Sequence, residues 1–181
     1  MKLSKLRLLL LFVLLLSLAG CKSSSQKRAE ALFGEGLKIS IEHGKVLERY
    51  AGEIAQIFTV QNRAKFPANR DSLSNRVHEV LPLLDESLRL ENEAAEKFEE
   101  SSRLWSKEQQ RKGVALIAAS YRKSIEIEQL FKEQALLVSD PTITDAKAFN
   151  EKLGRLNELV FQKQKESDAQ YNEGKRLMVE Q

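Results

Sequence analysis

Two histidines, His43 and His78, are the first residues to test for metal chemistry, because imidazole is the commonest metal ligand in proteins. A di-iron site in a helical bundle needs Glu-x-x-His pairs, but Ser40 and Asn75 stand three residues before the two histidines. A zinc site needs about three protein ligands, and neither His-x-x-x-His nor His-Glu-x-x-His occurs in the chain. The sequence therefore predicts no metal site, and it predicts that both histidines are exposed to solvent.

The other residues that carry chemistry form no catalytic arrangement either. The chain has no Gly-x-Ser-x-Gly motif for a nucleophilic serine and no glycine-rich phosphate loop. The densest acidic stretch contains Glu91, Glu93, Glu96, Glu99 and Glu100, and these spacings spread the carboxylates around a helix. Such a pattern favours a solvated helix face over a catalytic carboxylate pair. We therefore predict no catalytic residue, no cofactor and no enzyme activity.

The single cysteine, Cys21, follows a short apolar segment near the N-terminus. Residues 1–20 begin with positive charges and continue with an apolar run from Leu8 to Leu16, which is the layout of a secretory signal peptide. Even counted from Leu6 to Ala19, a helix would reach about 21 Å, whereas the hydrocarbon core of a membrane is about 30 Å thick. The segment therefore predicts a cleaved signal peptide and not a retained membrane span.

The tetrapeptide Leu18-Ala19-Gly20-Cys21 comes directly after this run and resembles the lipobox of bacterial lipoproteins. The resemblance implies that residues 1–20 are removed and that Cys21 is the lipid attachment site. Its thiol would carry diacylglycerol, and its amino group would usually carry a further acyl chain such as palmitate. Two or three acyl chains give stable anchoring, so we expect the protein to contact the membrane through Cys21.

The resemblance also implies a location in the bacterial cell envelope. The residue after the cysteine is Lys22 and not Asp. In a Gram-negative cell the lipoprotein sorting rules would then favour the periplasmic face of the outer membrane. In another bacterium the anchor would hold the protein on the outer face of the cytoplasmic membrane.

The charge of the chain changes when the signal peptide is taken away. The 29 Lys and Arg residues and 26 Asp and Glu residues give a net charge of +3. All three surplus positive charges, Lys2, Lys5 and Arg7, lie within the signal peptide, so the remainder of the chain is neutral. A neutral domain lacks the basic field that nucleic-acid binding requires, and we predict no nucleic-acid partner.

The chain after the signal peptide reads as a polar spacer, residues 21–27, followed by one helical domain, residues 28–181. From Arg28 onward apolar residues recur every three or four positions, which is typical of amphipathic helices. No sustained alternation and no hairpin signal indicates a strand. The first helical pattern runs from about Arg28 to Lys65 and ends before Phe66-Pro67.

Three further helical patterns follow. The second runs from about Leu73 to Trp105 and contains Pro82, which predicts a kink near residues 78–82 or a helix that ends there. The third is expected to begin at Ser106, because Ser106 and Gln109 fit a capping box, and to reach about Val138. The fourth follows the turn at residues 139–145, which offers several N-cap residues.

Four helices of similar length joined by short links predict an all-α fold, an antiparallel up-down four-helix bundle. The alternative is a three-helix arrangement in which the second helix continues from about Pro82 to Ser139. We expect Trp105, at the predicted junction, to be half exposed.

The bundle topology places the links at about residues 64–72 and 139–145 at the end far from Cys21. Phe66 and Arg70 in the first of these links are candidate contacts for a partner protein. The alternative for Phe66 is that it packs against the end of the core, as apolar residues that flank helix ends usually do.

The sequence favours a lipid-anchored envelope lipoprotein whose bundle acts as a structural or protein-interaction module, with an envelope protein as its partner. The alternative is a receptor or sensor that binds a small ligand between its helices at the membrane surface. Four glycines of the first helix, Gly34, Gly36, Gly44 and Gly52, motivate that alternative, because small residues permit close packing or a pocket.

Overall fold

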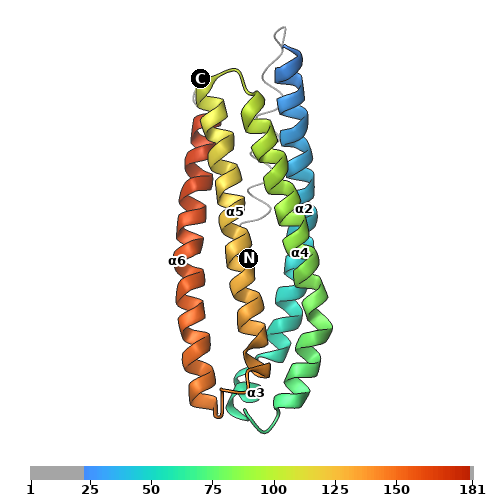
Figure 1. Ribbon diagram of the computed structural model, residues 1–181, viewed down its shortest axis with the longest axis vertical. Helices are drawn as coiled ribbons and strands as arrows, with labels where there is room; N and C mark the ends of the chain where they lie inside the picture. Colours follow the sequence, from blue (N-terminus) through green and yellow to red (C-terminus); the bar gives the residue numbers. More distant parts are fainter. Residues whose placement is uncertain (1–22, 180–181) are drawn as a thin grey trace.

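Helices form all the regular secondary structure of residues 23–179, which are the residues described by the computed structural model (Figure 1). Four helices of 29 to 35 residues lie side by side along the long axis of the molecule. The helices are α2 (Ser24–Ile57), α3 (Val60–Ala64), α4 (Arg70–Leu104), α5 (Glu108–Leu136), the short 3-10 helix η1 (Leu137–Ser139) and α6 (Ala146–Val179). The predicted all-α fold is confirmed. None of these helices contains an apolar stretch that would carry it across a lipid bilayer.

Residues that recur every seven positions contribute to the inner faces of α2, α4 and α5, as in coiled coils. Such a repeat keeps one stripe of side chains turned toward the neighbouring helices. The buried repeats are Ala29, Gly36, His43, Tyr50 and Ile57 on α2, Val77, Leu84, Glu91 and Phe98 on α4 with Trp105 just after it, and Val114, Glu128 and Ala135 on α5.

Side chains cap two of the long helices at their N-termini. Ser23 Oγ accepts a hydrogen bond from the Gln26 amide (3.2 Å) at the start of α2. Asp145 Oδ1 accepts one from the Ala148 amide (2.8 Å), which confirms that the 139–145 turn supplies the cap of the last helix. Each cap satisfies an amide that has no partner within its helix.

Several predicted helix boundaries need correction. α2 begins at Ser24, inside the stretch expected to be a spacer, and it ends at Ile57. The chain turns at Phe58, and Thr59 Oγ1 accepts a hydrogen bond from the Asn62 amide (3.1 Å), which starts α3. The first helix is therefore divided in two, because a threonine cap competes with helix continuation at this point.

The junction after α4 lies where we predicted it, but the capping box is wrong. Residues 105–107 separate α4 from α5, so the second helix does not continue to Ser139. Lys107 occupies the N-cap position, and Ser106 Oγ donates instead to Gln26 Oε1 of α2 (3.1 Å). Trp105 is only 6% exposed and not half exposed as expected. α4 also continues through Pro82, so no helix ends there.

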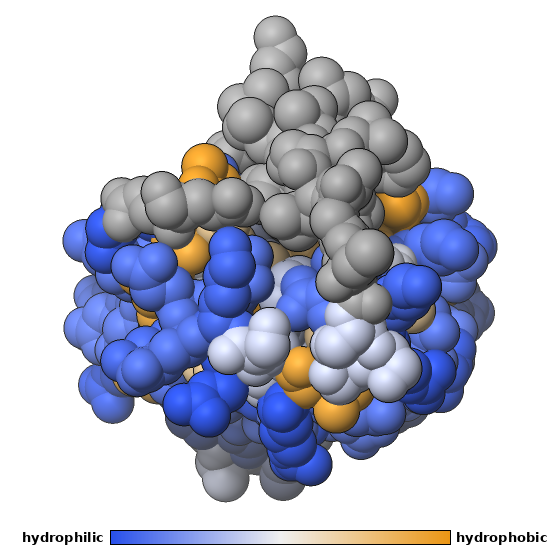
Figure 2. Space-filling view, turned by 90° about the horizontal axis from the view of Figure 1, so that it is seen from above, coloured by the Kyte–Doolittle hydropathy of each residue, from blue (hydrophilic) through white to orange (hydrophobic). Residues whose placement is uncertain are grey.

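The apolar core consists of two clusters, one toward each end of the long axis. The extensive helix contacts among residues 23–179 join α2 to α4, α4 to α5, and α5 to α6. One cluster contains Tyr50, Leu84 and Phe149, and the other contains Phe33, Phe98 and Tyr171. Seen from above, most of the periphery is hydrophilic, and hydrophobic residues show only in small patches (Figure 2).

Two glycines bring α5 and α6 into close contact. A Cβ atom on Gly113 would lie 2.7 Å from the Gly174 carbonyl oxygen, and one on Gly174 would lie 2.5 Å from the Gly113 carbonyl oxygen. On α2 only Gly36 meets a neighbour so closely, with Phe98 Cε1 2.9 Å from the position of a Cβ atom. Gly34, Gly44 and Gly52 have open space at that position, so these three glycines make no close contact with a neighbouring helix.

Candidate functional site

Three ionisable side chains from three helices meet inside the molecule, between the two apolar clusters. His43 comes from α2, Glu91 from α4 and Glu128 from α5. Their exposed fractions are 9%, 3% and 2%, so all three are buried. Because Glu and His are costly to bury without partners, the group needs a specific arrangement to be tolerated. We call His43, Glu91 and Glu128 the central triad.

The imidazole of His43 lies between the two carboxylates. Its Nδ1 is 3.0 Å from Glu91 Oε2, and its Nε2 forms a short hydrogen bond with Glu128 Oε1. Burial lowers the pKa of His43, but the hydrogen bond to Glu128 and the charges of both carboxylates outweigh that effect and raise the pKa above 6.5. The arrangement therefore favours a protonated imidazole in the absence of any other cation.

Polar side chains next to the central triad extend this layer across the molecule. Ser40 Oγ and Tyr121 Oη share a hydrogen bond of 2.5 Å between α2 and α5. Ser167 Oγ donates to the Ser120 carbonyl oxygen (3.0 Å), which connects α6 to α5. Burial, with a smaller contribution from the charge of Glu128, raises the pKa of Tyr50 to about 12. The middle of the molecule is thus polar on all four long helices.

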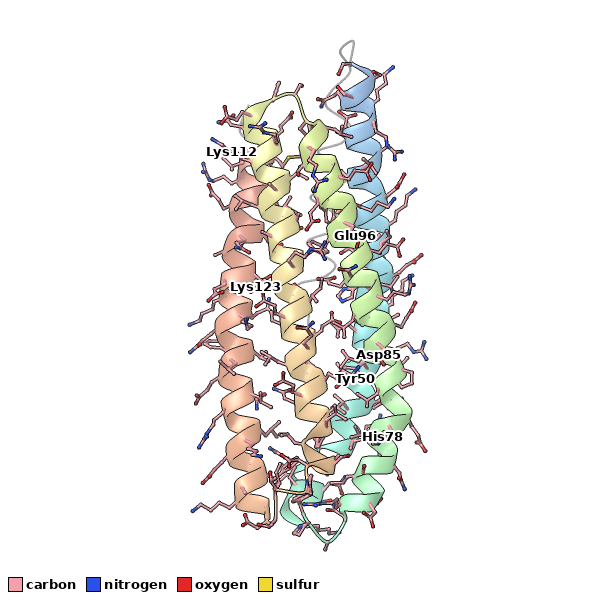
Figure 3. The ribbon with its side chains drawn as sticks, in the orientation of Figure 1. Tyr50, His78, Asp85, Glu96, Lys112 and Lys123 are labelled. Atoms are coloured by element: carbon pink, nitrogen blue, oxygen red, sulfur yellow. The ribbon has the colours of Figure 1, made fainter. Side chains whose placement is uncertain are left out.

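The central triad overturns two predictions. His43 is buried, although both histidines were expected to be exposed, and Glu91 lies in the interior and not on a solvated acidic face. The prediction holds for His78, which is exposed on α4 and whose Nδ1 is 2.7 Å from the Ser74 carbonyl oxygen (Figure 3). Glu96 and Glu100 are also exposed, as expected for a solvated face.

The seven-residue spacing of buried residues could have indicated that His43 and Glu91 are buried. His43 stands midway between Gly36 and Tyr50, and Glu91 stands midway between Leu84 and Phe98, always at intervals of seven. A charged residue at a core position on one helix indicates a buried partner on another. The expectation of no metal site rested on spacing within one helix, and it did not consider ligands contributed by three different helices.

The two links predicted at the far end do lie together. Phe66 is 3% exposed and its ring centroid is 4.9 Å from that of Phe149, so this side chain closes the end of the core. The Arg70 guanidinium is 5.0 Å from the Phe66 ring centroid and donates to the Ile143 carbonyl oxygen. The structure therefore gives Phe66 the alternative packing role, and it ties Arg70 to the second link.

A hollow of about 350 Å³ opens on the surface beside these residues. Residues of both links line it. Figure 1 shows this end of the molecule at the bottom. Its lining consists of Pro67, Ala68, Arg70, Asp71, Pro141 and Thr144. We call this surface the distal hollow.

Cys21 and the rest of the lipobox, with the whole predicted signal peptide, lie outside the described residues. No family model, no curated protein and no solved structure matches this chain.

Proposed function

We propose that this protein is a lipid-anchored protein of the bacterial envelope whose helical domain is an interaction module for another envelope protein. The observation that carries the proposal is Leu18-Ala19-Gly20-Cys21, a lipid attachment signal that ends three residues before Ser24, where α2 begins. A tether this short would keep the first turn of α2 beside the membrane.

The four long helices, in this proposal, form an antiparallel up-down bundle. The contacts of α2 with α4, α4 with α5 and α5 with α6 support it, since each helix packs on the next long helix in the chain. The bond of Ser106 to Gln26 joins the α4–α5 link to the start of α2. The same arrangement puts the distal hollow at the opposite end from the anchor.

The length of α2 defines the distance between anchor and contact surface. Its 34 residues span about 51 Å at the usual helical rise. A domain held upright by Cys21 would present the distal hollow about 50 Å from the lipid. The lining combines Arg70 and Asp71 with apolar and hydroxyl groups, which suits a polar segment of a protein partner.

Replacement of the proposed lipid attachment residue tests the anchor. The Cys21→Ala variant should incorporate no labelled fatty acid and should accumulate as the unprocessed precursor, because no thiol remains to accept diacylglycerol. The measurement is labelled palmitate in the purified protein together with its mass. Ser24→Ala, an exposed position three residues away, is the control and should be labelled like the natural chain. Labelling of the Cys21→Ala variant would reject the anchor.

Site-specific crosslinking in the producing bacterium tests the distal hollow. A photo-reactive phenylalanine analogue is placed at Ala68 or at Thr144, which are exposed and belong to different links. Both positions should give the same crosslinked product, because one partner would cover both links. Phe66 and Arg70 are unsuitable positions, since both support the end of the core.

Glu158, exposed on α6 between the two ends, is the matched control for this experiment and should give no such product. Equal products from Ala68 and Glu158, or no product from either link, would contradict the distal hollow as the contact surface. The anchor would stand in that case if Cys21→Ala still lost its lipid label.

A further inference from the structure

The central triad has the composition of a metal site. One ring nitrogen of His43 and one carboxylate oxygen each from Glu91 and Glu128 lie within 4.8 Å of one another. We propose that these three residues bind one divalent transition-metal ion in the middle of the helical domain. This inference is independent of the lipid anchor and of the distal hollow.

The charges of the central triad favour a cation. The two carboxyl groups and the imidazole are all buried, and each carboxyl group faces one nitrogen of the same ring. A buried charge without full compensation is strongly unfavourable. A divalent ion bound by a neutral imidazole and two ionised carboxylates would balance the charges completely. The buried carboxyl groups and imidazole are thus donors that suit a divalent cation.

Buried polar atoms next to the ligands are left without hydrogen-bond partners. Glu128 Oε2 has no hydrogen-bond partner among the described residues. Glu128 is only 2% exposed, so bulk water does not reach this atom. Ser87 Oγ, one helical turn from Glu91 on the same face of α4, is also buried and has none among these residues. Buried groups of this kind are rarely left unsatisfied. A bound ion that also carries a water molecule as a fourth ligand would give partners to Glu128 Oε2 and Ser87 Oγ.

The donor set limits the class of metal. One imidazole nitrogen and two carboxylate oxygens suit Zn²⁺, Mn²⁺, Fe²⁺ and Co²⁺, and the absence of a sulfur donor in the triad disfavours Cu⁺. Ligand atoms of a tetrahedral zinc site lie about 3.3 Å apart, since each is about 2.0 Å from the ion. The candidate ligand atoms of His43, Glu91 and Glu128 lie within 4.8 Å of one another, which is a wider spacing than in a tetrahedral zinc site. A single ion takes one ring nitrogen of His43, so the carboxylate that faces the other nitrogen would have to move to the same side of the ring by rotation about its χ angles.

Cobalt uptake by the full-length protein tests the site directly. The protein is purified with a tag free of histidine, treated with a chelator and titrated with Co²⁺ alone. We expect one Co²⁺ per chain with visible d–d absorption, loss of that absorption on addition of Zn²⁺, and a higher Tm with Zn²⁺ than with chelator. A natural chain that binds no Co²⁺ and whose Tm is the same with Zn²⁺ and with chelator would overturn the proposal.

Matched variants locate the ion. Glu91→Gln keeps the shape of the side chain and should weaken Co²⁺ binding by more than about tenfold, a loss that changes in outer partners of a ligand already cause. His43→Gln should do the same. His78→Gln and Glu96→Gln, which alter exposed residues of α4, should bind Co²⁺ like the natural chain.

Equal Co²⁺ affinity in the natural chain and in folded Glu91→Gln would show that the ion binds elsewhere, and would overturn the assignment. Loss of binding in His78→Gln alone would do so as well. If His43→Gln fails to fold, Glu91→Gln and the Tm of the natural chain still decide the question.

Discussion

Ser101 connects three parts of the chain through one hydroxyl group. Its Oγ donates to the Ala29 carbonyl oxygen on α2 (2.8 Å) and accepts from Trp105 Nε1 (3.0 Å) just beyond α4. A serine hydroxyl offers one donor and two acceptor positions, so a single atom serves both partners. Because Ser101 and Trp105 are both buried, water cannot replace these bonds easily.

We predict that Ser101→Ala lowers the free energy of unfolding by about 1–3 kcal/mol, because it leaves buried polar groups without a partner. The measurement is denaturant unfolding followed by far-UV circular dichroism and by the fluorescence of Trp105, the only tryptophan in the chain. Ser102→Ala is the control. Ser102 is half-buried and donates only to Glu99 of its own helix (2.7 Å), so we expect a change of about 0.5 kcal/mol or less. Equal effects of the two substitutions would refute this role for Ser101.

At the scale of the helices, the Gly113–Gly174 crossing sets the separation of α5 and α6. Each glycine stands where the other helix would collide with a Cβ atom, and Ile117 Cγ1 also lies 3.0 Å from the Cβ position of Gly174. The obstacle at Gly174 includes backbone atoms, which cannot rotate away as a side chain can. Only a shift of a whole helix would make room.

We predict that Gly174→Ala lowers the free energy of unfolding by about 1–3 kcal/mol through overpacking. Gly154→Ala on the same helix meets nothing within 4 Å and is the matched control. It should raise stability by about 0.5–1 kcal/mol, because alanine favours the helix. Thermal unfolding by circular dichroism measures both. A stabilising Gly174→Ala would mean that the two backbones are not in contact.

The helices themselves were largely predictable from local signals. Apolar spacing located the long helices, and residue types identified the turn at residues 139–145 with several N-cap candidates, of which Asp145 is the cap. The turn at Phe58 was not, because Thr59 acts as a cap only when the chain leaves the helix at that point. Ser106 was predicted to be a cap and is not one, because its hydroxyl donates to Gln26 of α2 and does not cap α5.

At the scale of the whole molecule, the sequence was less informative about which residues meet. The seven-residue repeat puts Glu91 in register with Leu84 and Phe98, although we predicted a solvated face for it. The repeat does not show that Glu91 and Glu128 lie opposite His43. That contact depends on how far each helix is shifted along its neighbour, which the lengths of the links and the glycine crossing determine together. The distal hollow was likewise predictable as a location, because the topology brings both links to one end, but its lining was not.

The central triad separates the two apolar clusters, and each cluster draws residues from all four long helices. Phe33, Phe98, Ile117 and Tyr171 lie in one, and Tyr50, Leu84, Ala135 and Phe149 lie in the other, together with their neighbours. No contiguous segment of the chain therefore contains a complete core. Loss of the last turns of α6 would remove Met178 from a cluster that also contains Ala29, near the start of the described chain. Neither end of the molecule can become an independent folding unit, and the domain must form from contacts between the most distant parts of its sequence.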